Sequence, residues 1–188
     1  MKRITALVLF CILMAACAPS FAEEAAAQSH ILVVYFSATG TTRGVAEKLA
    51  EGLSADLYEI VPAEPYTGAD LNYNDRKSRS SIEMNDPACR PAIAGELPDL
   101  TAYDTVLLGY PIWWGEAPRI VSSFVENADL TGKTLAVFFT SGSSGLGSSM
   151  KHLEQQAGAG TWLEGKRFTS RTTMEELTKW AASLGIKP

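Results

Sequence analysis

Apolar and polar residues follow one another along this chain in blocks that predict strands and helices in alternation. The apolar run ILVVYF, residues 31–36, has no polar face, which is typical of a strand covered on both sides in a parallel sheet. Apolar residues four positions apart then follow at Val45, Leu49 and Leu53, and they predict an amphipathic helix. Residues 31–53 therefore indicate a strand, a turn and a helix.

Further apolar runs predict four more strands, at residues 57–61, 105–110, 134–139 and 163–168. Helices are expected from Pro118 onward, over about residues 146–156, and from Thr173 to a stop at Gly185. A capping box of Thr173 and Glu176 begins the last of these helices. The long polar stretch 62–102 exceeds an ordinary loop, so we expect a helix within it, near residues 75–84.

Five strands that alternate with helices predict a doubly wound α/β domain with a parallel sheet. Right-handed crossovers then bring three strand ends, at Ser37, Pro111 and Ser141, to one edge of the sheet. Ligands of such sheets bind outside the carboxyl ends of the strands, where the strand order reverses. The loops at these three ends contain the hydroxyls, tryptophans and glycines best suited to binding a ligand, so we expect one binding site there.

The first loop, Ser37-Ala38-Thr39-Gly40-Thr41-Thr42, places four hydroxyls before a helix N-terminus, which suits a phosphate monoester. Neither the G-x-x-x-x-G-K-[ST] loop of nucleotidases nor the G-x-G-x-x-G dinucleotide fingerprint occurs at this position. The alternative interpretation is that Ser37, Thr39 and Thr42 only cap the helix.

The second loop contains adjacent tryptophans, Trp113 and Trp114, followed by Gly115. Two such side chains at one strand end cannot both enter one core, so we expect at least one near the surface, available to stack on a flat ring. The third loop, residues 140–148, consists mostly of glycine and serine, and its backbone can approach a planar heterocycle. Packing of both tryptophans under neighbouring loops, and a flexible linker at 140–148, are the respective alternatives.

The first 22 residues have the layout of a secretory signal: Lys2 and Arg3, an apolar stretch, and small residues before a cleavage point after Ala22. Residues 23–29 then form a short linker to a domain over 30–188. Cys17 offers a competing interpretation as a lipidated residue that tethers the protein to a membrane. Both interpretations predict a location in the periplasm or cell envelope.

Loss of the signal changes the formal net charge from −5 to −7, because Lys2 and Arg3 leave with it. This charge argues against nucleic acid as a partner. Cys89 is then the only thiol certain to remain, so no internal disulfide is expected in a soluble form. The two histidines, His30 and His152, are expected to be structural, and no residue cluster has zinc-ligand spacing.

Taken together, the three loops resemble those of flavodoxin-like, FMN-binding proteins. The sequences SATGTTR (37–43), YPIWWG (110–115) and TSGSSG (140–145) carry the resemblance, and the PIWWG form is similar to a bacterial flavodoxin subfamily. The resemblance implies a five-stranded parallel sheet in the order 2-1-3-4-5. It also implies that the first loop holds the FMN phosphate and that the other two hold the isoalloxazine.

By this resemblance the cofactor-binding residues are Ser37, Thr39, Gly40, Thr41, Thr42, Pro111, Ile112, Trp113, Trp114, Gly115, Ser141, Gly142, Ser143 and Gly145. The implied function is electron transfer or flavin-dependent reduction, with a redox protein or a small quinone-like molecule as partner. Two alternatives stay open: an NAD(P)H-dependent FMN or quinone reductase, in which Arg76, Lys77 and Arg79 recruit a nucleotide phosphate, and a binding module without redox activity.

Overall fold

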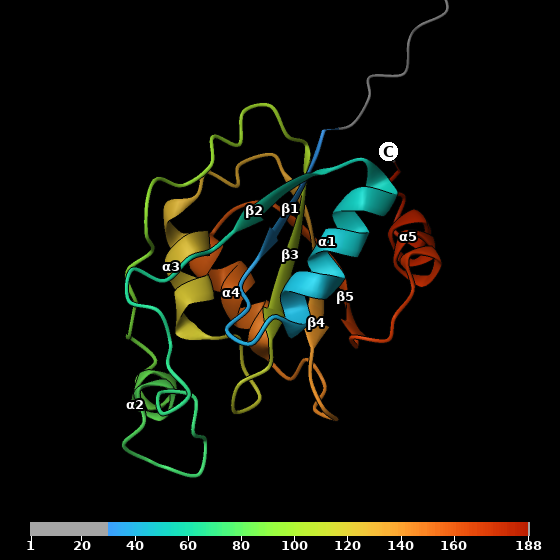
Figure 1. Cartoon of the computed structure of the whole chain (residues 1–188). Helices are drawn as coiled ribbons and strands as arrows, with labels where there is room; N and C mark the ends of the chain where they lie inside the picture. Colours follow the sequence, from blue (N-terminus) through green and yellow to red (C-terminus); the bar gives the residue numbers. More distant parts are fainter. Residues whose placement is uncertain (1–29, 188) are drawn as a thin grey trace, which may run out of the picture.

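The sheet consists of five parallel strands in the order β2-β1-β3-β4-β5, which confirms the predicted fold and strand order (Figure 1). The computed structural model describes residues 30–187; the predicted signal at 1–22, the linker at 23–29 and Cys17 lie outside the described residues. The strands are β1 (Ile31–Tyr35), β2 (Asp56–Glu59), β3 (Thr105–Pro111), β4 (Thr134–Thr140) and β5 (Thr161–Phe168).

Helices cover both faces of this sheet. They are α1 (Thr41–Leu53), α2 (Arg79–Asn85), α3 (Arg119–Asn127), α4 (Ser149–Ala157) and α5 (Met174–Ser183). Helices α1 and α5 pack together on one face, and α3 and α4 pack together on the other (Figure 1). Helix α2 lies outside both layers, in the long segment between β2 and β3 (Figure 1).

Strand β1 supplies apolar side chains to both halves of the core, because successive residues of a strand point to opposite faces. Leu32 and Val34 pack toward α3 and α4, whereas Ile31, Val33 and Tyr35 pack toward α1 and α5. All five residues are buried, as expected of a strand covered on both sides. The α1 residues predicted to face the core, Val45, Leu49 and Leu53, are buried as well, and so are Ile120, Val121, Phe124 and Val125 of α3.

Several predicted element boundaries were wrong by one to four residues. Strand β2 ends at Glu59, and Val61 is exposed, because β2 is an edge strand that pairs on one side only. Pro118 is the N-cap of α3 rather than its first helical residue. Helix α4 begins at Ser149 instead of 146, because Gly147 has a positive φ of 57° that a right-handed helix cannot contain.

The helix predicted within the long segment exists, but it begins at Arg79 instead of Asp75. Ser78 caps it, and its hydroxyl accepts a hydrogen bond from the Ser81 amide at 3.3 Å. A guanidinium nitrogen of Arg119, on α3, donates to the Met84 carbonyl at 3.0 Å and so ties α2 to the main domain. The capping box of Thr173 and Glu176 on α5 is confirmed.

Candidate functional site

The three predicted loops leave the sheet at the same edge. The register pairs Tyr35 with Gly109 and Pro111 with Thr140, so β1, β3 and β4 end close together. Beyond the end of β3, the Ile112 amide donates to the Thr140 carbonyl at 2.9 Å. The second loop is thereby attached to the strand from which the third loop departs.

The hydroxyls of the first loop divide into two groups. Within residues 30–187, those of Ser37, Thr39 and Thr41 make no side-chain hydrogen bond, whereas the Thr42 hydroxyl lies 2.8 Å from that of Thr140. The N-cap of α1 is Gly40, at φ +84°, and no side chain caps the helix. The capping interpretation is therefore wrong, and the free hydroxyls and first amides of α1 are available to an anion.

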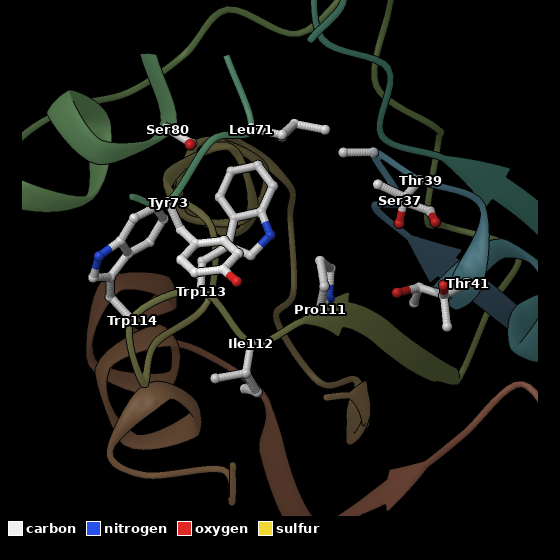
Figure 2. Close-up of a pocket in the computed structure, with 12 residues that line it drawn as sticks. Ser37, Thr39, Thr41, Leu71, Tyr73, Ser80, Pro111, Ile112, Trp113 and Trp114 are labelled. Carbon is white, nitrogen blue, oxygen red and sulfur yellow. The ribbon is translucent and has the colours of Figure 1, made fainter. Parts of the chain in front are cut away.

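A cavity of ≈ 360 Å³ opens beside these hydroxyls, a size typical of small-molecule sites (Figure 2). The first and second loops line one part of it. The other part is lined by Leu71, Tyr73 and Ser80, which belong to the long segment between β2 and β3. None of these three was predicted as a site residue, because no motif marks them and they reach the cavity only through the course of the chain.

The second loop makes a two-residue turn at Trp114 and Gly115. The flanking residues Trp113 and Glu116 exchange two backbone hydrogen bonds, each 2.9 Å long. Both turn residues have positive φ angles, 47° for Trp114 and 82° for Gly115, which is the requirement of a type I′ turn. The Trp114 side chain is 49% exposed, which confirms that at least one tryptophan lies near the surface.

Trp113, in contrast, is fixed by other rings. Its indole makes edge-on contacts with Phe36 and Tyr66, at centroid distances of 5.6 and 5.3 Å. The Tyr66 hydroxyl donates to the buried carboxylate of Glu83, and the Arg79 guanidinium lies 4.2 Å above the Tyr66 ring. Burial and the neighbouring Glu83 carboxylate raise the pKa of Tyr66 well above its usual value.

The third loop borders a second cavity of ≈ 410 Å³. Thr140, Ser141 and Gly142 line it together with residues 168–170 at the end of β5, which were not predicted either. It shares five lining residues with the first cavity: Thr39, Thr41, Pro111, Ile112 and Trp113. The two cavities therefore meet along the second loop.

Four of the predicted residues line neither cavity. Gly40 and Gly115 act through their backbone conformations, whereas Ser143 and Gly145 lie exposed in the third loop. The third loop nevertheless touches the second: a Cβ atom on Gly147 would lie 2.6 Å from the carbonyl oxygen of Gly115.

The two histidines lie away from both cavities. His30 is exposed just before β1, and His152 Nδ1 lies 3.1 Å from a carboxylate oxygen of Glu116. Residues 30–187 contain no group of three or more histidine, cysteine or acidic side chains that could hold a metal ion. Over the same residues, every helix is too short or too polar to span a bilayer.

The chemistry of the lining fits a phosphorylated cofactor with a flat ring system. Hydroxyls and helix amides at one end of the first cavity supply donors for a phosphate, and no carboxylate lines either cavity. The fixed Trp113 indole and the slim backbone of Ser141 and Gly142 supply surfaces for an aromatic ring.

Comparison with known proteins agrees with this chemistry. The flavodoxin family model matches residues 30–184. A protein from Bacteroides eggerthii assigned to the flavoproteins is 48% identical, with a TM-score of 0.80 over 85% of this chain and 99% of its own. A protein from Bacteroides uniformis, also assigned to the flavoproteins, is 43% identical, with a TM-score of 0.78 over 82% of this chain and 98% of its own.

The fold extends to more distant proteins. A flavoprotein from Lactobacillus acidophilus, solved in complex with FMN, is 23% identical, with a TM-score of 0.61 over 81% of this chain and 99% of its own. At that identity the likeness concerns the fold alone. A search of curated proteins finds no match to this chain.

Proposed function

Because this chain belongs to the flavodoxin family, with FMN as its cofactor, we propose that it is an exported redox protein of the cell envelope. In this role it carries out electron transfer or flavin-dependent reduction for a partner protein or a small quinone-like molecule. The observation that carries the proposal is the set of unpaired hydroxyls beside the N-terminus of α1, next to the fixed Trp113 ring.

Different residues of this chain are assigned to the phosphate and to the ring of FMN. Ser37, Thr39 and Thr41 would donate hydrogen bonds to the phosphate, together with the free amides at the start of α1. Trp113 lines one side of the ring site, and the third loop lines the other. Bound FMN supplies one-electron and two-electron chemistry, and the protein sets its access and potential.

The charge of the protein favours the oxidised cofactor. After loss of the signal the formal net charge is −7, and reduction adds negative charge to a site walled by aromatic side chains. We therefore expect a reduction potential below that of free FMN. A redox titration that gave a higher potential would contradict this expectation.

The alternative reductase function requires a cation to hold a nucleotide phosphate. Arg79 already donates hydrogen bonds to the Glu83 carboxylate and to the Glu64 carbonyl, each at 2.7 Å, and its guanidinium lies over the Tyr66 ring. Arg76 and Lys77 are exposed, and neither lines the two cavities. Pyridine nucleotides are also scarce outside the cytoplasm, so we rank a carrier that receives its electrons from a partner protein above the reductase.

Two measurements test the proposal. The purified mature protein is expected to show a flavin absorbance spectrum, and mass spectrometry of the released chromophore is expected to give FMN rather than riboflavin. A folded protein that stays colourless with FMN in excess would support the binding module without redox activity. Anaerobic mixing of the yellow protein with NADPH then separates the remaining functions, because rapid bleaching indicates the reductase.

Export is tested with the full-length chain. Fractionation of cells that express it is expected to place the protein outside the cytoplasm, with an N-terminus at residue 23. The variant Cys17→Ala separates the two forms: an unchanged soluble fraction supports the secreted protein, and a move from membrane to soluble fraction supports lipidation.

A further inference from the structure

Two large side chains stand exposed at the mouth of the first cavity. Tyr73 is 73% exposed and Trp114 is 49% exposed, and both line this cavity. Figure 2 shows the two rings on the side of the cavity away from Ser37 and Thr41. The other exposed large apolar residues among positions 30–187, which are Leu57, Val61 and Ile82, do not line it.

The backbone holds both rings in this exposed position. Trp114 adopts a left-handed conformation that costs free energy for a residue with a side chain, and the paired hydrogen bonds of Trp113 and Glu116 maintain it. On the opposite side, the Ser80 hydroxyl and amide both donate to the Asp70 carbonyl, at 2.5 and 3.0 Å. These bonds close the chain segment that carries Tyr73.

The cavity is apolar at its mouth and carries no formal charge. None of its lining residues is an acid, a lysine, an arginine or a histidine. Leu71 and Ile112 add apolar side chains to the lining of this cavity. Such a lining selects a neutral ligand, and its paired aromatic rings select a flat one.

The mouth and the third loop belong to different cavities, and Trp113 is one of the residues that these cavities share. This residue lines both cavities, and its contacts with Phe36 and Tyr66 prevent the indole from swinging aside. Tyr73 and Trp114 line only the first cavity, whereas Ser141 and Gly142 line only the second. A ring system held against the third loop therefore leaves the rings of Tyr73 and Trp114 uncovered.

We propose that Tyr73 and Trp114 form a second binding site, for a neutral, flat aromatic molecule of the quinone class, beside the cofactor. This inference rests on the proposed function, because it places the flavin ring on the third-loop side. Tyr73 then determines which molecules approach the cofactor, without holding the cofactor itself.

Equilibrium dialysis of the oxidised, FMN-loaded protein against 1,4-naphthoquinone tests the site. Both partners are oxidised, so no electron transfer disturbs the binding measurement. We expect Tyr73→Ala to weaken binding about tenfold and Tyr73→Phe to preserve it, because the ring supplies the contact. Ile82→Ala is the matched control, since Ile82 is an exposed apolar residue of the same segment outside the cavity, and it is expected to change nothing.

Two results would overturn the site. Equal binding by the wild type and Tyr73→Ala would show that the ring makes no contact with the quinone. Release of FMN by naphthoquinone, or weaker FMN binding in Tyr73→Ala, would show that Tyr73 covers the cofactor itself. A protein that binds no FMN refutes the proposed function instead, and the same dialysis on that protein still reports whether Tyr73 binds the quinone.

Discussion

The hydroxyl of Thr42, in the first turn of α1, lies 2.8 Å from the hydroxyl of Thr140 at the end of β4. Both side chains are buried, and each is the other's hydrogen-bond partner across 98 positions of sequence. The contact joins the first loop to the strand that leads into the third. It therefore couples the two ends of the proposed cofactor site.

Thr42→Val is expected to lower the free energy of unfolding of the apoprotein by about 1–3 kcal/mol, because it leaves the Thr140 hydroxyl buried without a partner. Urea denaturation measures this loss. The double variant Thr42→Val/Thr140→Val is the control and is expected to recover part of the loss. Additive losses in the two single variants would contradict the coupling.

Thr39→Val and Thr41→Val are expected to weaken FMN binding about tenfold each, through loss of a hydroxyl donor to the phosphate. Riboflavin, which lacks the phosphate, is expected to bind the variants and the wild type equally. Fluorescence titration of the apoprotein with each flavin gives both affinities. Thr161→Val, at the far end of the sheet, is the matched control; a parallel loss of riboflavin affinity would refute phosphate contact.

Gly147→Ala is expected to weaken FMN binding and to lower the free energy of unfolding by about 1–3 kcal/mol. Its φ of 57° disfavours a side chain, and a Cβ atom would lie 2.6 Å from the Gly115 carbonyl oxygen, so the second and third loops must separate. Gly145→Ala is the control in the same loop, because Gly145 lines neither cavity and nothing lies within 4 Å of its added Cβ. Equal effects of the two substitutions would argue against contact between the loops.

Trp114→Asn is expected to raise the free energy of unfolding of the apoprotein by about 1 kcal/mol, although it removes a large aromatic ring. Asparagine tolerates the left-handed conformation that Trp114 adopts at φ 47°. Trp113→Asn, which removes a ring packed on Phe36 and Tyr66, is expected to cost about 2–4 kcal/mol. Urea denaturation compares the two, and a loss of stability in Trp114→Asn would show that no strain is stored there.

The stability of the protein is expected to fall as the pH rises above about 10. Burial raises the pKa of Tyr66 and of Tyr110 in the folded state, so the unfolded chain releases these protons first. Each tyrosine then contributes a slope of up to about 1.4 kcal/mol per pH unit, with stability decreasing toward high pH.

Urea denaturation between pH 9 and 11 measures this slope. Tyr66→Phe is expected to make it shallower, because one titrating group is lost, and Tyr73→Phe serves as the control at an exposed tyrosine. A slope in Tyr66→Phe equal to that of the wild type would show that Tyr66 ionises alike in both states.

Residues close together in the sequence carried most of the correct predictions. The unbroken apolar run of β1 and the capping box of α5 each depend on the order of a few neighbours, so pattern alone identifies them. Element ends were less accurate. The predicted start of α4 was wrong because Gly147 has a positive φ, at a point where the third loop approaches the second, and no local pattern contains that approach.

The course of residues 60–104 had no local signal. An isolated antiparallel bridge between Pro62 and Ile93 and the bond from Arg119 to Met84 are among the contacts that hold this segment in place. Tyr73 reaches the cavity as a consequence, about forty positions before Trp114. The long polar stretch in the sequence indicated an unusual segment, but it did not indicate that this segment lines the cavity.

The sequence by itself determined the class of this protein: a parallel α/β sheet with three loops whose hydroxyls, indoles and glycines suit a phosphorylated flavin. Those properties follow from side-chain chemistry and from the alternation of apolar runs, which are local. Only the tertiary structure decided that Thr42 is buried against Thr140, that Trp113 is fixed while Trp114 is exposed, and that Tyr73 completes the cavity. Each of these depends on contacts between distant segments, and such contacts exist only once the chain has folded.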